Sequence, residues 1–266
     1  MSNNSGKHFL VVGNGPSLAS IDDRRLDSSA YVVRVNNFFF ESQYYTGKRV
    51  DLVQVGGDRW IFPFYSKTLK RVLKVNEYDI RGWSSHQPKV AKRGQTLLEE
   101  VPFRRMSYRD NHVKRTVERL SLKHRAAPTT GIFAVVNAHA MGAETITLAG
   151  IDFYEGSRRY AHHIGPRASE VVLAHKNYNN FYHSAALDVE IIDYLCARGD
   201  VVVQKASTAI RTISHLPLAP LYAEHISAEP KSEVINDWER WVGPWPLTLA
   251  KKLRRLREIQ KYGARS

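Results

Sequence analysis

The chain has 266 residues, of which 43% are hydrophobic and 24% charged. This composition excludes wholesale disorder and suits one large domain, or one domain with a small appendage. The single cysteine, Cys196, excludes an intramolecular disulfide framework and a Cys-rich zinc site. Lysine and arginine number 39 against 26 aspartates and glutamates, a net charge of +13. That excess suits a polyanionic partner such as nucleic acid, an anionic membrane surface or a phosphate-bearing substrate.

The hydrophobic runs of the chain are short. The run near the start, 9–12, is too short for a signal peptide, and no stretch approaches the ~20 apolar residues of a membrane-spanning helix. We therefore expect a cytoplasmic protein.

Predicted strands and helices alternate along the chain. In chain order, the apolar patterns predict a strand over 8–12, a helix from Leu18 onward, strands over 30–35 and 49–55, a helix over 66–75, a helix over 130–141, a strand over 145–149, a helix over 184–198 and a strand over 200–204. The basic stretch that follows the helix over 66–75 and extends to about residue 125 gives no clear pattern. Alternation of this kind predicts a mostly parallel, doubly wound α/β sheet.

A glycine-containing turn, Gly13-Asn14-Gly15-Pro16-Ser17-Leu18, directly follows the first predicted strand. A strand followed by such a turn and a helix places main-chain N–H groups where they can bind a phosphate. The turn has two glycines of the dinucleotide-binding pattern but has Leu18 where the third would stand, which argues against NAD. Phosphate binding and an ordinary tight turn both remain open.

Three further groups of polar or aromatic residues stand at strand or helix ends. They are Arg34-Val-Asn36-Asn37-Phe38, Gly150-Ile-Asp-Phe-Tyr154 with the nearby Tyr160, and 177–184, which contains His183. Asparagine can contact a sugar or base edge, phenols can bind a phosphate that gains charge, and histidine can act as a general base. Each group also has an ordinary interpretation, as a turn former, a packing aromatic or a solvated histidine. The histidines 162, 163 and 175 have equal local claims to the role of base.

Metal-binding patterns are absent from the sequence. It contains no Asp-x-Asp, no His-x-x-x-His and no Cys-x-x-Cys. We therefore expect no metal cofactor.

Taken together and in this order, the motifs resemble those of the bacterial lipooligosaccharide sialyltransferases, glycosyltransferase family 42. The matching segments are Gly13 to Leu18, Arg34 to Phe38 through Tyr45, Thr129 to Gly131, Gly142 to Tyr154, Tyr160, and His183-Ser184. The resemblance covers roughly residues 8–220. It implies a single Rossmann-like nucleotide-binding α/β domain, a metal-independent variant of the glycosyltransferase A type, with a small lid over the site.

The resemblance also implies roles for individual residues. Those of the donor site would be Asn14, Gly15 and Ser17 near the phosphate, Asn36 at the cytidine or phosphate, and Thr129, Thr130 and Gly131 in the loop for the ribose and carboxylate. Tyr154 and Tyr160 match the tyrosines that hold the leaving phosphate, and His183 matches the general base. The sequence departs from the family at Ala127, where an arginine is expected and Arg125 is the candidate replacement, at Thr130, which replaces a serine, and at Gly56, which replaces an asparagine.

The resulting function prediction is a sialyltransferase. It would move sialic acid from CMP-sialic acid to a terminal sugar of lipooligosaccharide, with galactose expected, by an inverting and metal-independent reaction. Two alternatives are another nucleotide-sugar glycosyltransferase-like protein on the same scaffold and a basic nucleic-acid-binding protein. The tyrosine and histidine set favours sialyl transfer. Aromatic residues do not interleave with the basic run as a nucleic-acid stacking platform requires, so we expect no nucleic-acid partner.

The last 41 residues form a predicted tail with a different composition. We expect a catalytic domain over 1–225, with the lid at about 160–182, and a basic tail over 226–266. The tail carries Trp238, Trp241 and Trp245, followed by leucines at helical spacing among lysines and arginines. Such a segment can lie on an anionic membrane, which would place the enzyme peripherally on the inner membrane. The alternative is a helix packed on the body or on another subunit, and a homo-oligomer is expected.

Overall fold

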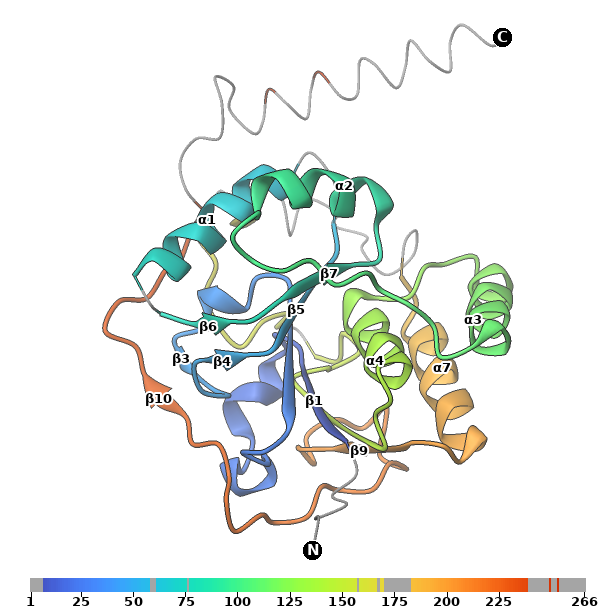
Figure 1. The fold of residues 1–266 in the computed structure, drawn as a ribbon. Helices are drawn as coiled ribbons and strands as arrows, with labels where there is room; N and C mark the ends of the chain where they lie inside the picture. The colour runs from blue at the N-terminus through green and yellow to red at the C-terminus, as the bar shows by residue number, and fades with distance from the viewer. Residues whose placement is uncertain are drawn as a thin grey trace, which may run out of the picture.

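A computed structural model describes residues 7–57, 61–75, 77–156, 158–166, 168–169 and 183–238, together with Leu249 and Leu253. At its centre lies a six-stranded parallel sheet with the strand order β7-β5-β2-β1-β8-β9 (Figure 1). The strands are β1 (His8–Val12), β2 (Tyr31–Val35), β5 (Leu52–Val55), β7 (Trp83–Ser85), β8 (Thr145–Ala149) and β9 (Val202–Lys205). This sheet confirms the predicted α/β, Rossmann-like fold.

The strand order reverses beside β1. The chain moves outward from β1 through β2, β5 and β7, and then returns to add β8 on the other side of β1. Val12 pairs with Arg34 of β2 and with Ala149 of β8, so the three strands end at the same level. Open α/β sheets bind ligands at such a switch point, beyond the carboxyl ends of the strands.

Helices cover the sheet and add to its core. Those within the described residues are α1 (Phe62–Lys74), α2 (Pro88–Leu97), α3 (Asn111–His124), α4 (Thr130–Ala140) and α7 (Ala185–Arg198). Helix α4 contacts β1, β2, β5 and β8, and α7 packs on α3, α4 and β9. The strands β1 and β8 are almost wholly buried, as expected of parallel strands with both faces covered.

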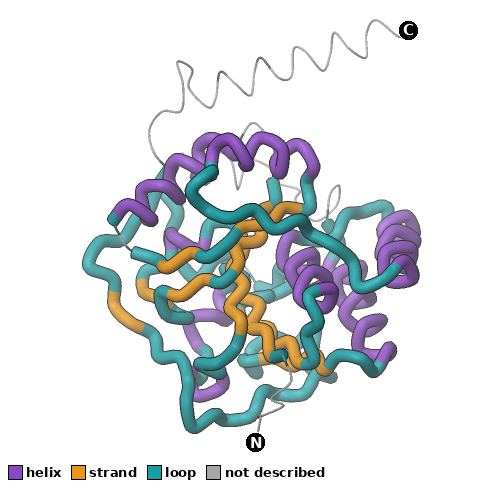
Figure 2. The backbone as a smooth tube through the Cα atoms, viewed as in Figure 1, coloured by secondary structure: helices purple, strands orange, loops and turns teal. Residues whose placement is uncertain are grey.

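Short elements complete the fold outside the main sheet. They are three 3₁₀ helices (Pro16–Ser20, Asp23–Arg25 and Phe38–Phe40) and two small sheets that pair β3 (Gln43–Tyr44) with β10 (Glu229–Pro230) and β4 (Arg49–Val50) with β6 (Asp79–Ile80). Figure 2 shows that much of the remaining chain is loop, including the long segment that runs around the outside of the fold through β10.

Most predicted elements are confirmed, and two need correction. The helix expected from Leu18 onward is wrong, because the 3₁₀ helix ends at Ser20, Ile21 is extended, and Asp22 caps the next short helix through Arg24 N. The strand expected over 49–55 is broken at Asp51, whose carboxylate accepts a hydrogen bond from Val32 N at 2.9 Å.

Helix α3 was missed, although its sequence carries a signal. Its buried residues are Val113, Thr116, Val117 and Leu120, at helical spacing. Asp110 caps the helix by accepting a hydrogen bond from Val113 N at 2.8 Å. These four residues form a narrow, largely apolar stripe among basic residues, which is why the charge of the segment hid its periodicity.

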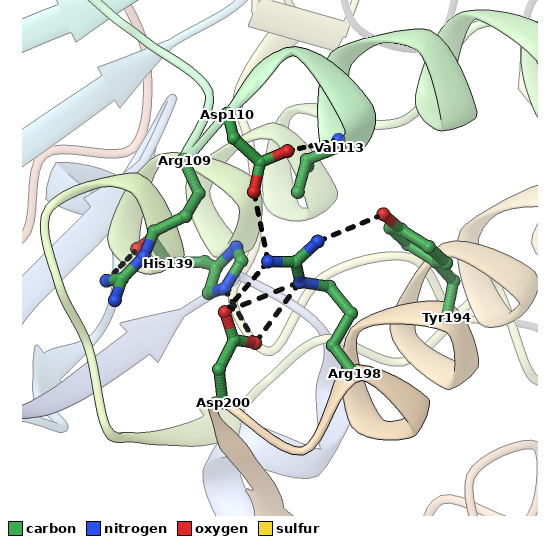
Figure 3. A network of polar contacts seen from close by, with 7 residues as sticks. All are labelled: Arg109, Asp110, Val113, His139, Tyr194, Arg198 and Asp200. Atoms are coloured by element: carbon green, nitrogen blue, oxygen red, sulfur yellow. Dashed lines mark hydrogen bonds and ion pairs between the residues drawn. The ribbon is translucent and has the colours of Figure 1, made fainter.

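An ionic network joins the ends of three helices (Figure 3). Arg198, the last residue of α7, contacts Asp200 and Asp110 at 3.0 Å, and Asp200 also contacts Nε2 of the buried His139 at 3.1 Å. Hydrogen bonding to Arg198 lowers the pKa of Asp200 to about 2. The network therefore fixes the C-terminal ends of α4 and α7 relative to each other and to the N-terminus of α3.

The first part of the predicted tail packs on the body. Ile235 and Trp238 are 4% and 3% exposed, and the Trp238 ring lies 6.2 Å from that of Phe40 and 6.4 Å from that of Phe64. Trp238 is thus part of the core, and its predicted place at a membrane surface is wrong. Trp241 and Trp245 lie outside the described residues. Within the described part of the chain, no helix has the length and hydrophobicity to cross a bilayer.

Candidate active site

The glycine turn after β1 is locked to the turn after β8. Gly13 N donates to Ala149 O and Gly15 N donates to Gly150 O, both at 2.8 Å. A Cβ atom on Gly13 would overlap the Gly150 carbonyl, and one on Gly15 would overlap the carboxyl group of Asp152. Glycine is required at both positions because the two turns approach too closely to leave room for a Cβ atom.

Side chains around the glycine turn are held by the neighbouring strands. Asn14 is 8% exposed and its Nδ2 donates to Val35 O at 2.9 Å. Ser17 N donates to Asp152 Oδ2 at 2.7 Å, and the Ser17 hydroxyl donates to the other oxygen of the same carboxylate. Burial raises the pKa of Asp152, although the hydrogen bonds from Ser17 oppose this. Asp152 received no role from its sequence motif, because its partner stands 135 residues earlier.

Asn36 and Gly56 link the ends of β2 and β5. Asn36 has a left-handed φ of 46°, and its Oδ1 accepts a hydrogen bond from Gly56 N at 2.8 Å. A Cβ atom on Gly56 would overlap Thr130 Oγ1 and would lie 3.1 Å from His86 Cε1. A side chain at position 56, where the resemblance predicts an asparagine, would therefore meet Thr130 and His86.

The loop at the N-terminus of α4 is fixed by α7. Thr129 caps α4, and its N–H donates to Asp188 Oδ1 at 3.1 Å. Gly131 follows at a close approach, since a Cβ atom there would lie 2.7 Å from Ile151 Cδ1. Asp188 is 2% exposed, and burial raises its pKa to about 7. This carboxyl group was also missed, because an acidic residue in the first turn of a helix has an ordinary explanation in the helix dipole.

His183 lies just before α7, which Ser184 caps. Its Nδ1 donates to Ala127 O at 2.8 Å, since a carbonyl oxygen can only accept. That bond leaves the lone pair on Nε2, the nitrogen that can take a proton. Burial lowers the pKa of His183, although the bond to Ala127 opposes it. A neutral imidazole with a fixed tautomer meets the requirement for a general base at neutral pH.

His86 follows the end of β7, and its ring lies next to Gly56. Its ring stacks on Phe133 with the centroids 4.0 Å apart. Burial lowers the pKa of His86 to about 4, and the charge of His183 adds to the effect. Nothing in the sequence separates His86 from the other ten histidines, so sequence reasoning missed it.

The segments that carry the two predicted tyrosines both contact the glycine turn, through Asp152 and through Ala161. Tyr154 has a left-handed φ of 62° and follows Asp152. Tyr160 is half-buried, and the next residue, Ala161, donates its N–H to Asn14 O at 2.9 Å. Arg125, the candidate replacement for the missing arginine, is exposed and ends α3 with a left-handed φ of 48°.

The rival histidines occupy different surroundings. His162 is buried, and burial, followed by the charges of Arg34 and Lys231, lowers its pKa to about 3. His163 is exposed, and residue 175 lies outside the described residues, as does most of the predicted lid. The described residues contain no cluster of three or more His, Cys, Asp or Glu able to hold a metal ion.

The predicted site residues thus gather along one edge of the sheet, around the switch point between β1 and β8. Contacts connect Ser17 to Asp152, Asn36 to Gly56, and Thr129 to the helix that follows His183. His183 is joined to this edge through Ala127, and Tyr160 through the bond from Ala161 N to Asn14 O. A polar, main-chain-rich edge of this kind defines an enzyme of the nucleotide-binding α/β class.

Comparison with known proteins identifies the family. The family profile "Alpha-2,3-sialyltransferase (CST-I)" matches residues 7–85 and 111–239. The chain belongs to this family of sialyltransferases, as the resemblance of its motifs predicted. None of the curated proteins matches the chain by sequence.

Solved structures show the same fold. The monofunctional alpha-2,3-sialyltransferase Cst-I from Campylobacter jejuni is 21% identical, with a TM-score of 0.78 and 98% of each chain covered. The sialyltransferase CstII from Campylobacter jejuni, in complex with the substrate analogue CMP-3FNeuAc, is 23% identical, with a TM-score of 0.74 over 90% of this chain and 96% of that one. A complex of CST-II with a trisaccharide acceptor and CMP is 22% identical, with a TM-score of 0.71 over 89% and 96%.

The buried Asp188 predicts a pH-dependent stability. Its pKa is about 7 in the folded chain but about 4 when unfolded. The folded state therefore binds more protons between these values, and the free energy of unfolding falls as pH rises from about 4 to 7. Asp188→Asn keeps an oxygen that can accept from Thr129 N but carries no charge. The variant should reduce the fall in unfolding free energy between pH 5 and 8 by on the order of 2 kcal/mol.

Denaturant titrations at the two pH values measure this difference. Asp193→Asn is the matched control, because Asp193 lies on the same helix and pairs with His215 at the surface. A wild-type pH slope in Asp188→Asn would contradict the assignment.

Proposed function

We propose that this protein transfers sialic acid from CMP-sialic acid to a terminal sugar of a lipooligosaccharide, with galactose as the expected acceptor. Family membership supports sialyl transfer. The observation that carries the mechanism is His183, whose Nδ1–H is fixed on Ala127 O, so that Nε2 carries the basic lone pair. Relatives of the same fold bind a CMP-sialic acid analogue, and CMP with a trisaccharide acceptor, which supports the donor and the acceptor class.

The donor determines what the site must stabilise. CMP-sialic acid carries its phosphate on a tertiary anomeric carbon, so departure leaves an oxocarbenium-like centre and collects negative charge on the phosphate. The hydroxyl groups of Tyr154 and Tyr160, with N–H groups of the turn at Asn14 to Ser17, would receive that charge. Asn36 would contact the nucleotide, and Thr129, Thr130 and Gly131 would bind the ribose and carboxylate.

The acceptor hydroxyl attacks the anomeric carbon from the face opposite the phosphate. His183 Nε2 takes the proton of that hydroxyl as the new bond forms, so one displacement gives inversion. Most of the remaining rate acceleration comes from holding donor and acceptor together in one orientation.

Replacement of His183 tests the mechanism. His183→Ala should lower kcat for transfer from CMP-sialic acid by about 10²–10⁴, the usual range for a positioned base, with little change in CMP affinity. Tyr154→Phe and Tyr160→Phe should each lower kcat as well, because each phenol acts on the departing phosphate. Release of CMP in the presence of a galactoside acceptor is the measurement.

The exposed His163 provides the control, since His163→Ala should turn over like the wild type. Wild-type turnover by His183→Ala would remove His183 from the mechanism. Absence of CMP release by the wild-type chain would overturn the function itself.

We also propose that no metal takes part. The motivation is that the sequence lacks Asp-x-Asp and supplies two phenols for the leaving phosphate. Transfer should therefore survive chelation by EDTA at its full rate. Loss of activity that returns only with added Mg²⁺ or Mn²⁺ would contradict this prediction.

The basic end of the chain is proposed to bind an anionic membrane surface. Its support is the run of basic residues between Lys251 and Lys261; the segment lies outside the described residues apart from Leu249 and Leu253. A chain that ends after Trp238 keeps the buried Ile235 and Trp238, so it should fold and transfer to a small acceptor. It should fail to sediment with anionic vesicles at low salt, whereas the full chain should sediment. Equal sedimentation of both chains would contradict the proposal.

That the protein is a homo-oligomer stays a prediction, which its mass in solution tests.

A further inference from the structure

Two consecutive residues of the turn after β8 have backbone angles that side chains disfavour. Phe153 has a φ of 49° and Tyr154 a φ of 62°. Each left-handed residue other than glycine costs on the order of 1–3 kcal/mol and persists only where its surroundings impose it. The backbone of this turn sets the direction of the Tyr154 side chain, so the contacts that hold the turn also fix where the phenol points.

The contacts on one side of the turn are those of the core and the glycine turn. Asp152 is fixed by the two hydrogen bonds from Ser17, and Phe153 is 7% exposed within the main hydrophobic cluster. The turn itself closes with a hydrogen bond from Glu155 N to Asp152 O at 2.8 Å. These contacts fix where the turn begins.

The side chain of Glu155 holds the other end. Its Oε2 accepts a hydrogen bond from Arg211 N at 3.0 Å, and its Oε1 accepts one from Thr212 N. Burial opposes the charge of this carboxylate, but the hydrogen bonds from Thr212 and Arg211 hold its pKa below the ordinary value. Both oxygens of one carboxylate therefore clamp two successive main-chain amides, 56 and 57 residues further along the chain.

The loop that receives Glu155 is itself anchored. Ile213 is fully buried, and the Nζ of the buried Lys205, at the end of β9, donates to Ile213 O at 3.0 Å and to Ser214 O at 2.9 Å. Glu155 thus ties the turn of Tyr154 to the end of the neighbouring strand.

We infer that Glu155 is a positioning residue for Tyr154: by clamping Arg211 N and Thr212 N, it keeps the left-handed turn in the conformation that aims the phenol. The inference rests on the proposed role of Tyr154 at the leaving phosphate. Glu155 acts only through the turn and touches neither donor nor acceptor.

The first experiment compares single variants. Glu155→Ala should lower kcat by roughly tenfold to a hundredfold, because a misplacement of about 1 Å can cost that much. The affinity for CMP, measured by calorimetry, and the melting temperature should stay close to wild type, since Arg211 is exposed and Thr212 half-buried, so water can reach the two amides that Glu155 releases. Glu155→Gln keeps an accepting oxygen and should recover most of kcat.

The control is Glu144→Ala, an exposed acid just before the other end of β8, which should behave as wild type. A Glu155→Ala variant with wild-type kcat would overturn the inference. A variant that lowers the melting temperature but leaves kcat of the folded protein intact would also overturn it, because the role would then be structural only.

A double-mutant cycle separates this inference from the function on which it rests. If Glu155 acts through Tyr154, then Glu155→Ala should have little further effect on kcat in a Tyr154→Phe background. Fully additive losses would overturn the inference while leaving the role of Tyr154 intact. Wild-type kcat in Tyr154→Phe would instead remove the role of Tyr154, and the inference with it. Faster amide exchange at residues 153–155 in Glu155→Ala, measured without any substrate, is the expected structural signature.

Discussion

The main-chain contact between the turn after β1 and the turn after β8 is the constraint on which the rest of the site depends. Gly13 and Gly15 donate hydrogen bonds to Ala149 and Gly150, and a Cβ atom on either glycine would overlap the second turn. Because the two turns are in contact, Ser17 can bind Asp152, and the chain that follows Asp152 can carry Tyr154 beside the proposed donor turn. The missing third glycine of a dinucleotide pattern fits this arrangement, since Leu18 is buried beside Gly150 in a short 3₁₀ helix and not in an α-helix.

The second half of the site depends on two parallel helices fixed at both ends. At their N-terminal ends, Asp188 holds Thr129, and His183 holds Ala127. At the opposite ends, the network around Arg198 and Asp200 joins the same helices. The proposed base and the proposed donor loop are thus presented by elements that cannot shift independently, as catalysis by positioning requires.

At position 56, where the resemblance predicts an asparagine, the structure gives a physical reason for glycine. Gly56 cannot carry a side chain because Thr130 Oγ1 fills that space, and the ring of His86, stacked on Phe133, lies at its edge. A side chain at position 56 would therefore clash unless Thr130 and His86 moved.

The sequence by itself determined the parallel sheet, the helices α4 and α7, the turn chemistry at the strand ends, and the family. These features are local: the apolar period, the glycines of a turn and the capping residue of a helix can each be read within about ten neighbouring residues. It did not determine the 3₁₀ helix after the first turn or the burial of Trp238 in the core. Nor did it single out Asp152, Asp188, His86 and Glu155, whose roles come from partners more than fifty residues distant or from rings brought together by folding. Only the tertiary structure decides such contacts, because the sheet order brings together strand ends that are far apart in the sequence, and the local sequence of one strand end does not specify its partner.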